Sequence, residues 1–144
     1  MRHRVAIISL TAALAAPVLS GATALQAAPA MPVFSHQRAQ VFALCSGRLA
    51  ALASHQKSSR NAAAPESQRL REEFDMLLDA VLPHAMEDGV PEDQAARWRS
   101  QGWSEIAGYL ADQAYSFDAR IAENARVAAA DRIAECRELL LPTT

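Results

Sequence analysis

The sequence contains only five glycines, and they do not gather into a glycine-rich loop. It therefore has neither the phosphate-binding loop of nucleotide-binding proteins nor the G-x-S-x-G turn of serine hydrolases, which both need closely spaced glycines. No segment alternates apolar and polar residues with the period of two that is typical of a strand. These absences favour a helical protein that is not an enzyme, with an unrecognised enzyme as an alternative.

The chain also has little net charge, because its 14 basic residues nearly balance its 16 acidic ones. Proteins that bind nucleic acid or anionic membranes usually carry a basic surface. The sequence therefore does not predict nucleic acid as a partner.

The first 27 residues have the composition of a signal peptide. A basic start, a short apolar stretch and a run of small residues follow one another, as in secretory signals. Cleavage after Ala24 or after Ala27 fits, and removing residues 1–27 from the 144 leaves 117. An uncleaved membrane anchor is the alternative, but a proline and a glycine interrupt the apolar run. We expect a periplasmic or secreted protein with no stable membrane insertion after cleavage.

The chain has two cysteines, Cys45 and Cys136, and both lie in the part expected to be exported. They form no C-x-x-C pair and are too few for a zinc site. Oxidising compartments permit disulfides, and two cysteines allow one intramolecular pairing. A disulfide that closes a loop of about 90 residues would lower the conformational entropy of the unfolded chain and so stabilise the fold by ~4 to 5 kcal/mol.

Apolar residues recur at helical spacing through most of the remaining chain. Residues 28–34 contain two prolines and predict an extended lead-in, while residues 35–144 form the helical domain. The predicted helices span residues 35–56, 65–82, 91–114 and 117–141.

Several residues suggest where these helices begin and end. Ser35 is expected to cap the first helix, and Pro65 with its acidic neighbour to begin the second. Pro83 should end or kink the second helix, and Pro91 should begin the third.

A single helix over residues 91–141 would be roughly 75 Å long, far longer than a small domain allows. It must therefore fold back. The best position is residues 115–118, where Ser116 or Asp118 can cap a new helix. Gly102 is the alternative position.

Four helices of similar length predict an all-α, up-down four-helix bundle. In that topology the first and last helices are antiparallel neighbours. Cys45 lies in the first half of the first helix and Cys136 near the end of the last, so both reach similar heights. One disulfide would then join the first and last helices.

The C-S-G-R-L-x-A-L run at Cys45 and the C-x-x-L-L-L run at Cys136 resemble small secreted two-cysteine helical proteins of proteobacteria. The likeness covers only the two ends of the mature domain. It implies a helical fold and a periplasmic setting, and it carries over no activity.

One group of residues could in principle hold a metal ion: His84, Glu87, Asp88, Glu92 and Asp93. Their spacing matches no EF-hand, and a turn followed by a helix N-terminus explains the acidic residues. The histidines are scattered and suggest no axial pair for haem. We therefore predict no metal and no cofactor.

The helix over residues 91–114 carries both tryptophans. A bundle-facing stripe is expected to contain Trp103, Ile106, Leu110 and Ala114. Trp98 and Tyr109 would then lie at its edge, where aromatic rings often anchor partners. The alternative is that Gly102 kinks the helix and buries both tryptophans.

The preferred hypothesis is a periplasmic protein that binds another protein or an envelope component, as an adaptor, inhibitor or chaperone-like factor. A bundle that binds a small ligand or metal between its helices is the alternative.

Overall fold

The computed structural model describes residues 31–140, which contain four α-helices and no strand. They are α1 (Ser35–Ser58), α2 (Ala64–Glu87), α3 (Gln94–Tyr115) and α4 (Ala119–Leu140). The predicted all-α, four-helix fold is confirmed. Residues 1–30, which include the expected signal peptide, lie outside the described residues, as does Leu141.

The turn between α1 and α2 is shorter than predicted. The backbone N–H of Asn61 donates to the carbonyl oxygen of Gln56 at 2.8 Å, and Arg60 adopts the left-handed conformation with φ 57°. This is the Schellman arrangement that satisfies the last carbonyls of a helix. Pro65 lies in the first turn of α2 with Glu66 beside it, as predicted.

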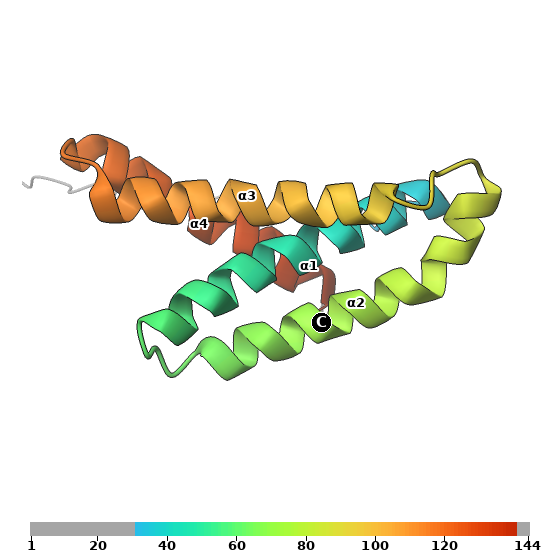
Figure 1. Ribbon diagram of the computed structural model, residues 1–144, viewed down its shortest axis with the longest axis horizontal. Helices are drawn as coiled ribbons and strands as arrows, with labels where there is room; N and C mark the ends of the chain where they lie inside the picture. Colours follow the sequence, from blue (N-terminus) through green and yellow to red (C-terminus); the bar gives the residue numbers. More distant parts are fainter. Residues whose placement is uncertain (1–30, 141–144) are drawn as a thin grey trace, which may run out of the picture.

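The prediction allowed Pro83 either to end or to kink the second helix, and it does not end it, because α2 runs on to Glu87. Figure 1 shows α2 bent near its C-terminal end. A proline removes one backbone hydrogen bond, here to the carbonyl of Asp79. Both residues are exposed, so water can satisfy that carbonyl. The helix ends instead where Gly89 adopts φ 97° and the N–H of Val90 donates to Ala85.

Two predicted helix starts also differ. Ser35 does not cap α1, since its hydroxyl donates to the carboxylate of Asp88 and thereby ties the start of α1 to the α2–α3 turn. The third helix begins at Gln94, three residues later than expected from Pro91. Pro91 instead accepts a hydrogen bond from the N–H of Gln94 in a preceding turn, at 3.0 Å.

The break between α3 and α4 lies where the sequence predicted it. A carboxylate oxygen of Asp118 accepts hydrogen bonds from the backbone N–H of Arg120 at 2.8 Å and of Ile121 at 3.4 Å. Asp118 therefore acts as the N-cap of α4, satisfying N–H groups that have no partner within the helix.

The first helix is the centre of the bundle. It packs along both α2 and α3, while α4 packs mainly along α3 and reaches α1 over a shorter length (Figure 1). Phe42 and Leu49 of α1 are buried against Phe74 and Leu78 of α2 and Ile106 of α3. The contact between α1 and α4 is therefore smaller than the contact between the first and last helices of a regular four-helix bundle.

Two helices approach closely where Gly47 of α1 meets Gly102 of α3. A Cβ atom on Gly102 would overlap the carbonyl oxygen of Leu44, and one on Gly47 would overlap that of Arg99. These are backbone atoms that cannot move aside alone. Any larger residue at either position would therefore push α1 and α3 apart.

The predicted pair Cys45 and Cys136 is confirmed as a disulfide that joins α1 to α4, with 5.5 Å between the two Cα atoms. Four charged side chains form a closed ring beside it. Arg48 pairs with Glu105 at 2.8 Å and Glu135 at 3.2 Å, and Arg132 pairs with Glu105 at 3.0 Å and Glu135 at 2.7 Å. The negative charge of Glu135, with that of Glu105, raises the pKa of Arg132. The ring and the disulfide together hold α4 against α1 and α3.

Candidate functional site

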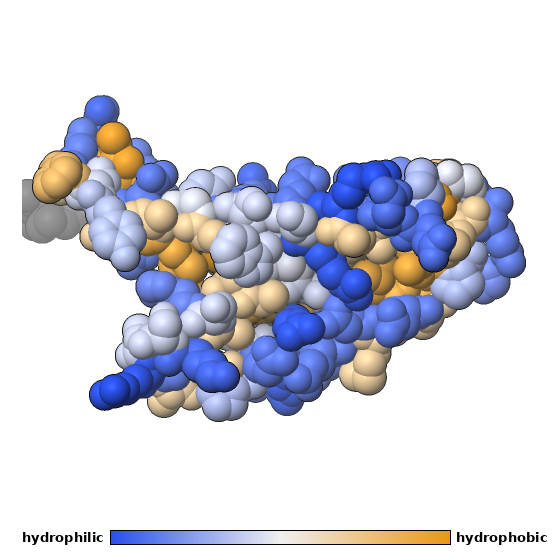
Figure 2. Space-filling view, viewed as in Figure 1, coloured by the Kyte–Doolittle hydropathy of each residue, from blue (hydrophilic) through white to orange (hydrophobic). Residues whose placement is uncertain are grey.

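A cleft opens where α1 and α3 separate. From their contact at Gly47 and Gly102, the two helices diverge toward their C-terminal ends, at the left in Figure 1. The space-filling view shows a notch between the end of the α3–α4 hairpin and the end of the α1–α2 hairpin (Figure 2). The tight glycine contact therefore fixes the closed end of the cleft, and the free helix ends form its mouth.

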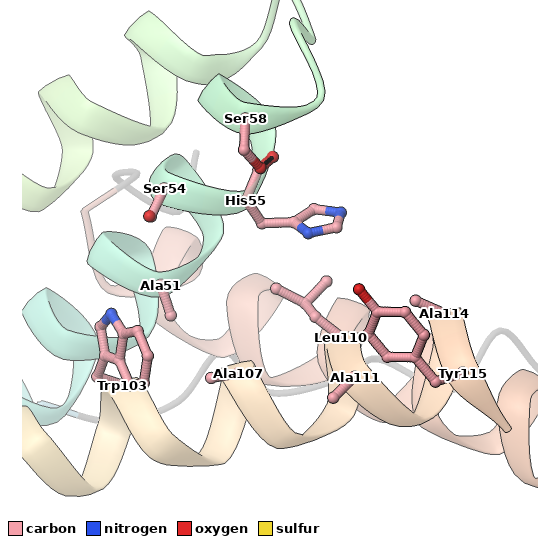
Figure 3. A pocket seen from close by; sticks show the side chains of 10 residues that line it. All are labelled: Ala51, Ser54, His55, Ser58, Trp103, Ala107, Leu110, Ala111, Ala114 and Tyr115. Carbon is pink, nitrogen blue, oxygen red and sulfur yellow. Dashed lines mark hydrogen bonds between the residues drawn. The ribbon is translucent and has the colours of Figure 1, made fainter.

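Small side chains cover much of the cleft's surface, and its volume is about 250 Å³. α1 contributes Ala51, Ser54, His55 and Ser58, and α3 contributes Trp103, Ala107, Leu110, Ala111, Ala114 and Tyr115. Figure 3 shows these residues on the two facing helices. Side chains as small as alanine allow another chain to approach the α3 backbone closely.

Two aromatic rings mark the ends of this surface. Trp103 adjoins the glycine contact and is 48% exposed, whereas Tyr115 ends α3 and is 80% exposed. Beyond Tyr115, the fully exposed Phe117 and the half-exposed Ile121 extend the apolar surface over the α3–α4 turn. Large exposed apolar side chains grouped in this way are typical of interaction surfaces.

The structure agrees with one part of the predicted arrangement of α3 side chains and differs from another. Trp98 and Tyr109 are half-buried and pack against the core, in agreement with a position at the edge of the stripe. The prediction that Trp103 and Ala114 face the bundle is wrong, because both are exposed. The face of α3 toward α1 is centred on Gly102, and Trp103, one residue on, is turned about 100° away from it.

His55 contributes an imidazole ring to the cleft. Figure 3 shows it on the α1 wall, with Leu110 and Tyr115 on the α3 wall opposite. Two serine hydroxyls, those of Ser54 and Ser58, belong to the same wall, and Ser58 donates its hydrogen bond to the carbonyl of His55 at 2.8 Å. The cleft thus offers a few hydrogen-bonding groups on one wall and mainly apolar surface on the other.

The side chains of His84 and the acidic residues that follow it do not come together into a metal site. His84 contacts Glu87 at 3.3 Å, and both side chains are about three-quarters exposed. Within residues 31–140, no three His, Cys, Asp or Glu side chains lie close enough together to hold a metal ion. In the same residues, no helix is both long and apolar enough to cross a membrane.

No protein-family model, curated protein or solved structure matches this chain. The resemblance to secreted two-cysteine helical proteins therefore stays a prediction.

Sequence reasoning did not single out the cleft. Its signal is weak, because Ala107, Ala111 and Ala114 recur at helical spacing but look like ordinary core positions. Only the position of the glycine contact shows that this alanine face points away from the core.

Proposed function

We propose that this protein is an exported, non-enzymatic binding protein, and that it holds an apolar helical segment of another protein in the cleft between α1 and α3. The proposal rests on one observation: exposed Trp103 and Tyr115 stand at the two ends of an alanine-lined surface. Aromatic side chains contribute much of the binding energy in many interfaces, and they do so best beside close-packed surroundings.

The shape of the cleft supports a helix as the bound segment. Ala107, Ala111 and Ala114 lie on one face of α3 and span two helical turns. A second helix can lie along this face because small side chains permit a short interaxial distance. Helix-in-groove binding of this kind uses an amphipathic segment whose apolar face enters the groove.

Export is part of the same proposal. The N-terminal sequence has the features of a secretory signal, and the Cys45–Cys136 disulfide is a bond that persists in oxidising compartments. The partner would then be a protein of the periplasm or cell exterior. N-terminal sequencing of the exported form should return Leu25 or Ala28, whereas Met1 or the second residue would contradict export with cleavage.

Alanine variants of the exposed aromatic residues test the binding surface. We expect both Trp103→Ala and Tyr115→Ala to keep wild-type helicity. Tyr115→Ala should also keep the melting temperature, because Tyr115 is 80% exposed, whereas Trp103→Ala should lower it slightly, because Trp103 is 48% exposed. Both should lose a partner that wild type captures from its own periplasm. Met76→Ala is the matched control, since Met76 is 65% exposed on α2, far from the cleft, and this variant should retain the partner.

Trp98→Ala separates the cleft from the neighbouring edge of α3. Trp98 and Tyr109 were the predicted partner-binding residues, and their role in binding stays a proposal alongside the cleft. If Trp98→Ala loses the partner at unchanged stability while Trp103→Ala retains it, the binding surface is the Trp98 edge and the cleft is wrong. If neither loses the partner, both assignments fail.

A further inference from the structure

A second cavity, of about 420 Å³, lies where α1, α3 and α4 meet. It shares only Leu110 with the cleft described above, so the two are separate cavities. Leu52 of α1, Ile106 of α3 and Ile133 of α4 give it an apolar lining. Pockets that hold small molecules are commonly this size and mostly apolar, with a few polar groups that orient the ligand.

Gln56 is the polar side chain that distinguishes this cavity. It lines the cavity, is only 9% exposed, and its Oε1 atom is buried with no hydrogen-bond partner among the described residues. A buried carbonyl oxygen without a donor is costly and uncommon in proteins. The terminal torsion of a glutamine amide is soft, so rotation of the amide can turn this oxygen toward the cavity that the side chain lines.

The charges near the cavity do not favour an ionic ligand. Arg137 and Glu138 are adjacent on α4, both are exposed, and their opposite charges largely compensate. A buried charge needs a partner of opposite sign, and the apolar lining from Leu52, Ile106 and Ile133 offers none. The lining therefore suits a neutral molecule that brings its own hydrogen-bond donor.

We propose that this cavity binds a small neutral alcohol or phenol with an apolar body, whose hydroxyl group donates a hydrogen bond to Oε1 of Gln56. The apolar body would lie against Ile106 and Ile133. A cavity of about 150 Å³ lined by apolar side chains already accommodates benzene. The larger volume here leaves room for a ring with a short alkyl chain.

Two probes that differ only in the hydroxyl group test this assignment. We would titrate the mature, oxidised protein with 4-propylphenol and with propylbenzene, and follow binding by backbone amide chemical shifts. The phenol should bind about tenfold more tightly, because one hydrogen bond to a buried acceptor is worth roughly that factor. Gln56→Leu, which nearly conserves the side-chain volume, should bind both probes equally and keep the affinity for propylbenzene.

Two tryptophan substitutions locate the site. Ala134→Trp fills the second cavity from an exposed position and should abolish binding of both probes, whereas Ala111→Trp fills only the cleft between α1 and α3 and should leave binding unchanged. No binding by wild type, or a tenfold preference that survives Gln56→Leu, would overturn the proposal. Loss of binding in Ala111→Trp alone would also overturn it. Each result is independent of protein capture by the cleft, because capture is measured with Trp103 and Tyr115 variants.

Discussion

Replacing Gly102 with alanine tests the glycine contact on which the cleft depends. The added Cβ atom would overlap the carbonyl oxygen of Leu44 and would lie only 3.0 Å from its carbonyl carbon and 3.1 Å from its Cα atom. Ordinary van der Waals contact begins at 3.4 Å. Since all three atoms belong to the backbone of α1, the helices themselves must separate.

The expected change is a net loss of stability. Alanine favours a helix over glycine by about 1 kcal/mol, but overpacking at a rigid contact costs typically 1 to 3 kcal/mol and occasionally more. The contact here is with backbone, so the upper part of that range applies. We therefore expect Gly102→Ala to lower the free energy of unfolding by about 2 kcal/mol.

Gly108 provides a matched control in the same helix. It is exposed, and a Cβ atom built on it would meet no atom within 4 Å. Gly108→Ala should therefore add only the higher helix propensity of alanine, and it should raise the free energy of unfolding by about 1 kcal/mol. Urea unfolding, followed by circular dichroism, measures both changes. If Gly102→Ala also stabilises the protein, α1 and α3 do not meet at this glycine and the geometry of the cleft is wrong.

Three perturbations, of the disulfide, of the Arg48 ion pairs and of the Asp118 cap, test what holds α4 in place, with variants of Arg97 and Asp112 as controls. Replacing Cys45 and Cys136 together with alanine should lower the free energy of unfolding by about 2 to 5 kcal/mol, because the disulfide closes a loop between positions 91 residues apart; an unchanged urea midpoint would show that the stability of the fold does not depend on the disulfide. Arg48→Met should cost about 1 to 3 kcal/mol, because it removes two charge-assisted hydrogen bonds at a side chain that is 13% exposed. Arg97→Met, which breaks the exposed pair with Asp93, should cost under about 1 kcal/mol, and equal losses would contradict this ranking. Asp118→Ala removes the cap of α4 and should cost about 1 kcal/mol, while Asp112→Ala should leave thermal unfolding nearly unchanged.

Most of the fold can be predicted from local features of the sequence. Apolar residues at helical spacing predict the helices, Pro65 and Asp118 mark the starts of α2 and α4, and the two cysteines predict the disulfide. Each of these acts within a turn or through a single covalent pairing, so each can be inferred without knowing the packing.

Packing was harder to predict, because large apolar side chains are not a reliable guide to burial where two helices meet at glycines. The sequence predicts Trp103 inside the bundle, but it is 48% exposed, while Gly102, the alternative position for the break or a kink, is the buried contact. Two helices approach most closely where side chains are smallest, and one position of difference turns a helix face by about 100°. The cleft follows from this contact, so it could not be predicted without it.

Pro83 shows the same limit in a single element. A proline inside a helix removes one hydrogen bond, but its effect depends on what surrounds the freed carbonyl. Near the solvent-exposed end of α2, that loss does not stop the helix from continuing to Glu87. The sequence gives the proline but does not give its exposure.

Site-specific photo-crosslinking tests the central claim most directly. A benzophenone amino acid would replace Tyr115 in the cleft or the exposed Met76 of α2, and cells that express the protein would be irradiated. We expect position 115 to crosslink to one partner protein through an apolar, helix-forming peptide identified by mass spectrometry, and Ala111→Trp to suppress that adduct. Position 76 should give no adduct with the same peptide. An identical adduct from both positions, or an adduct at position 115 that Ala111→Trp leaves unchanged, would contradict binding in the cleft.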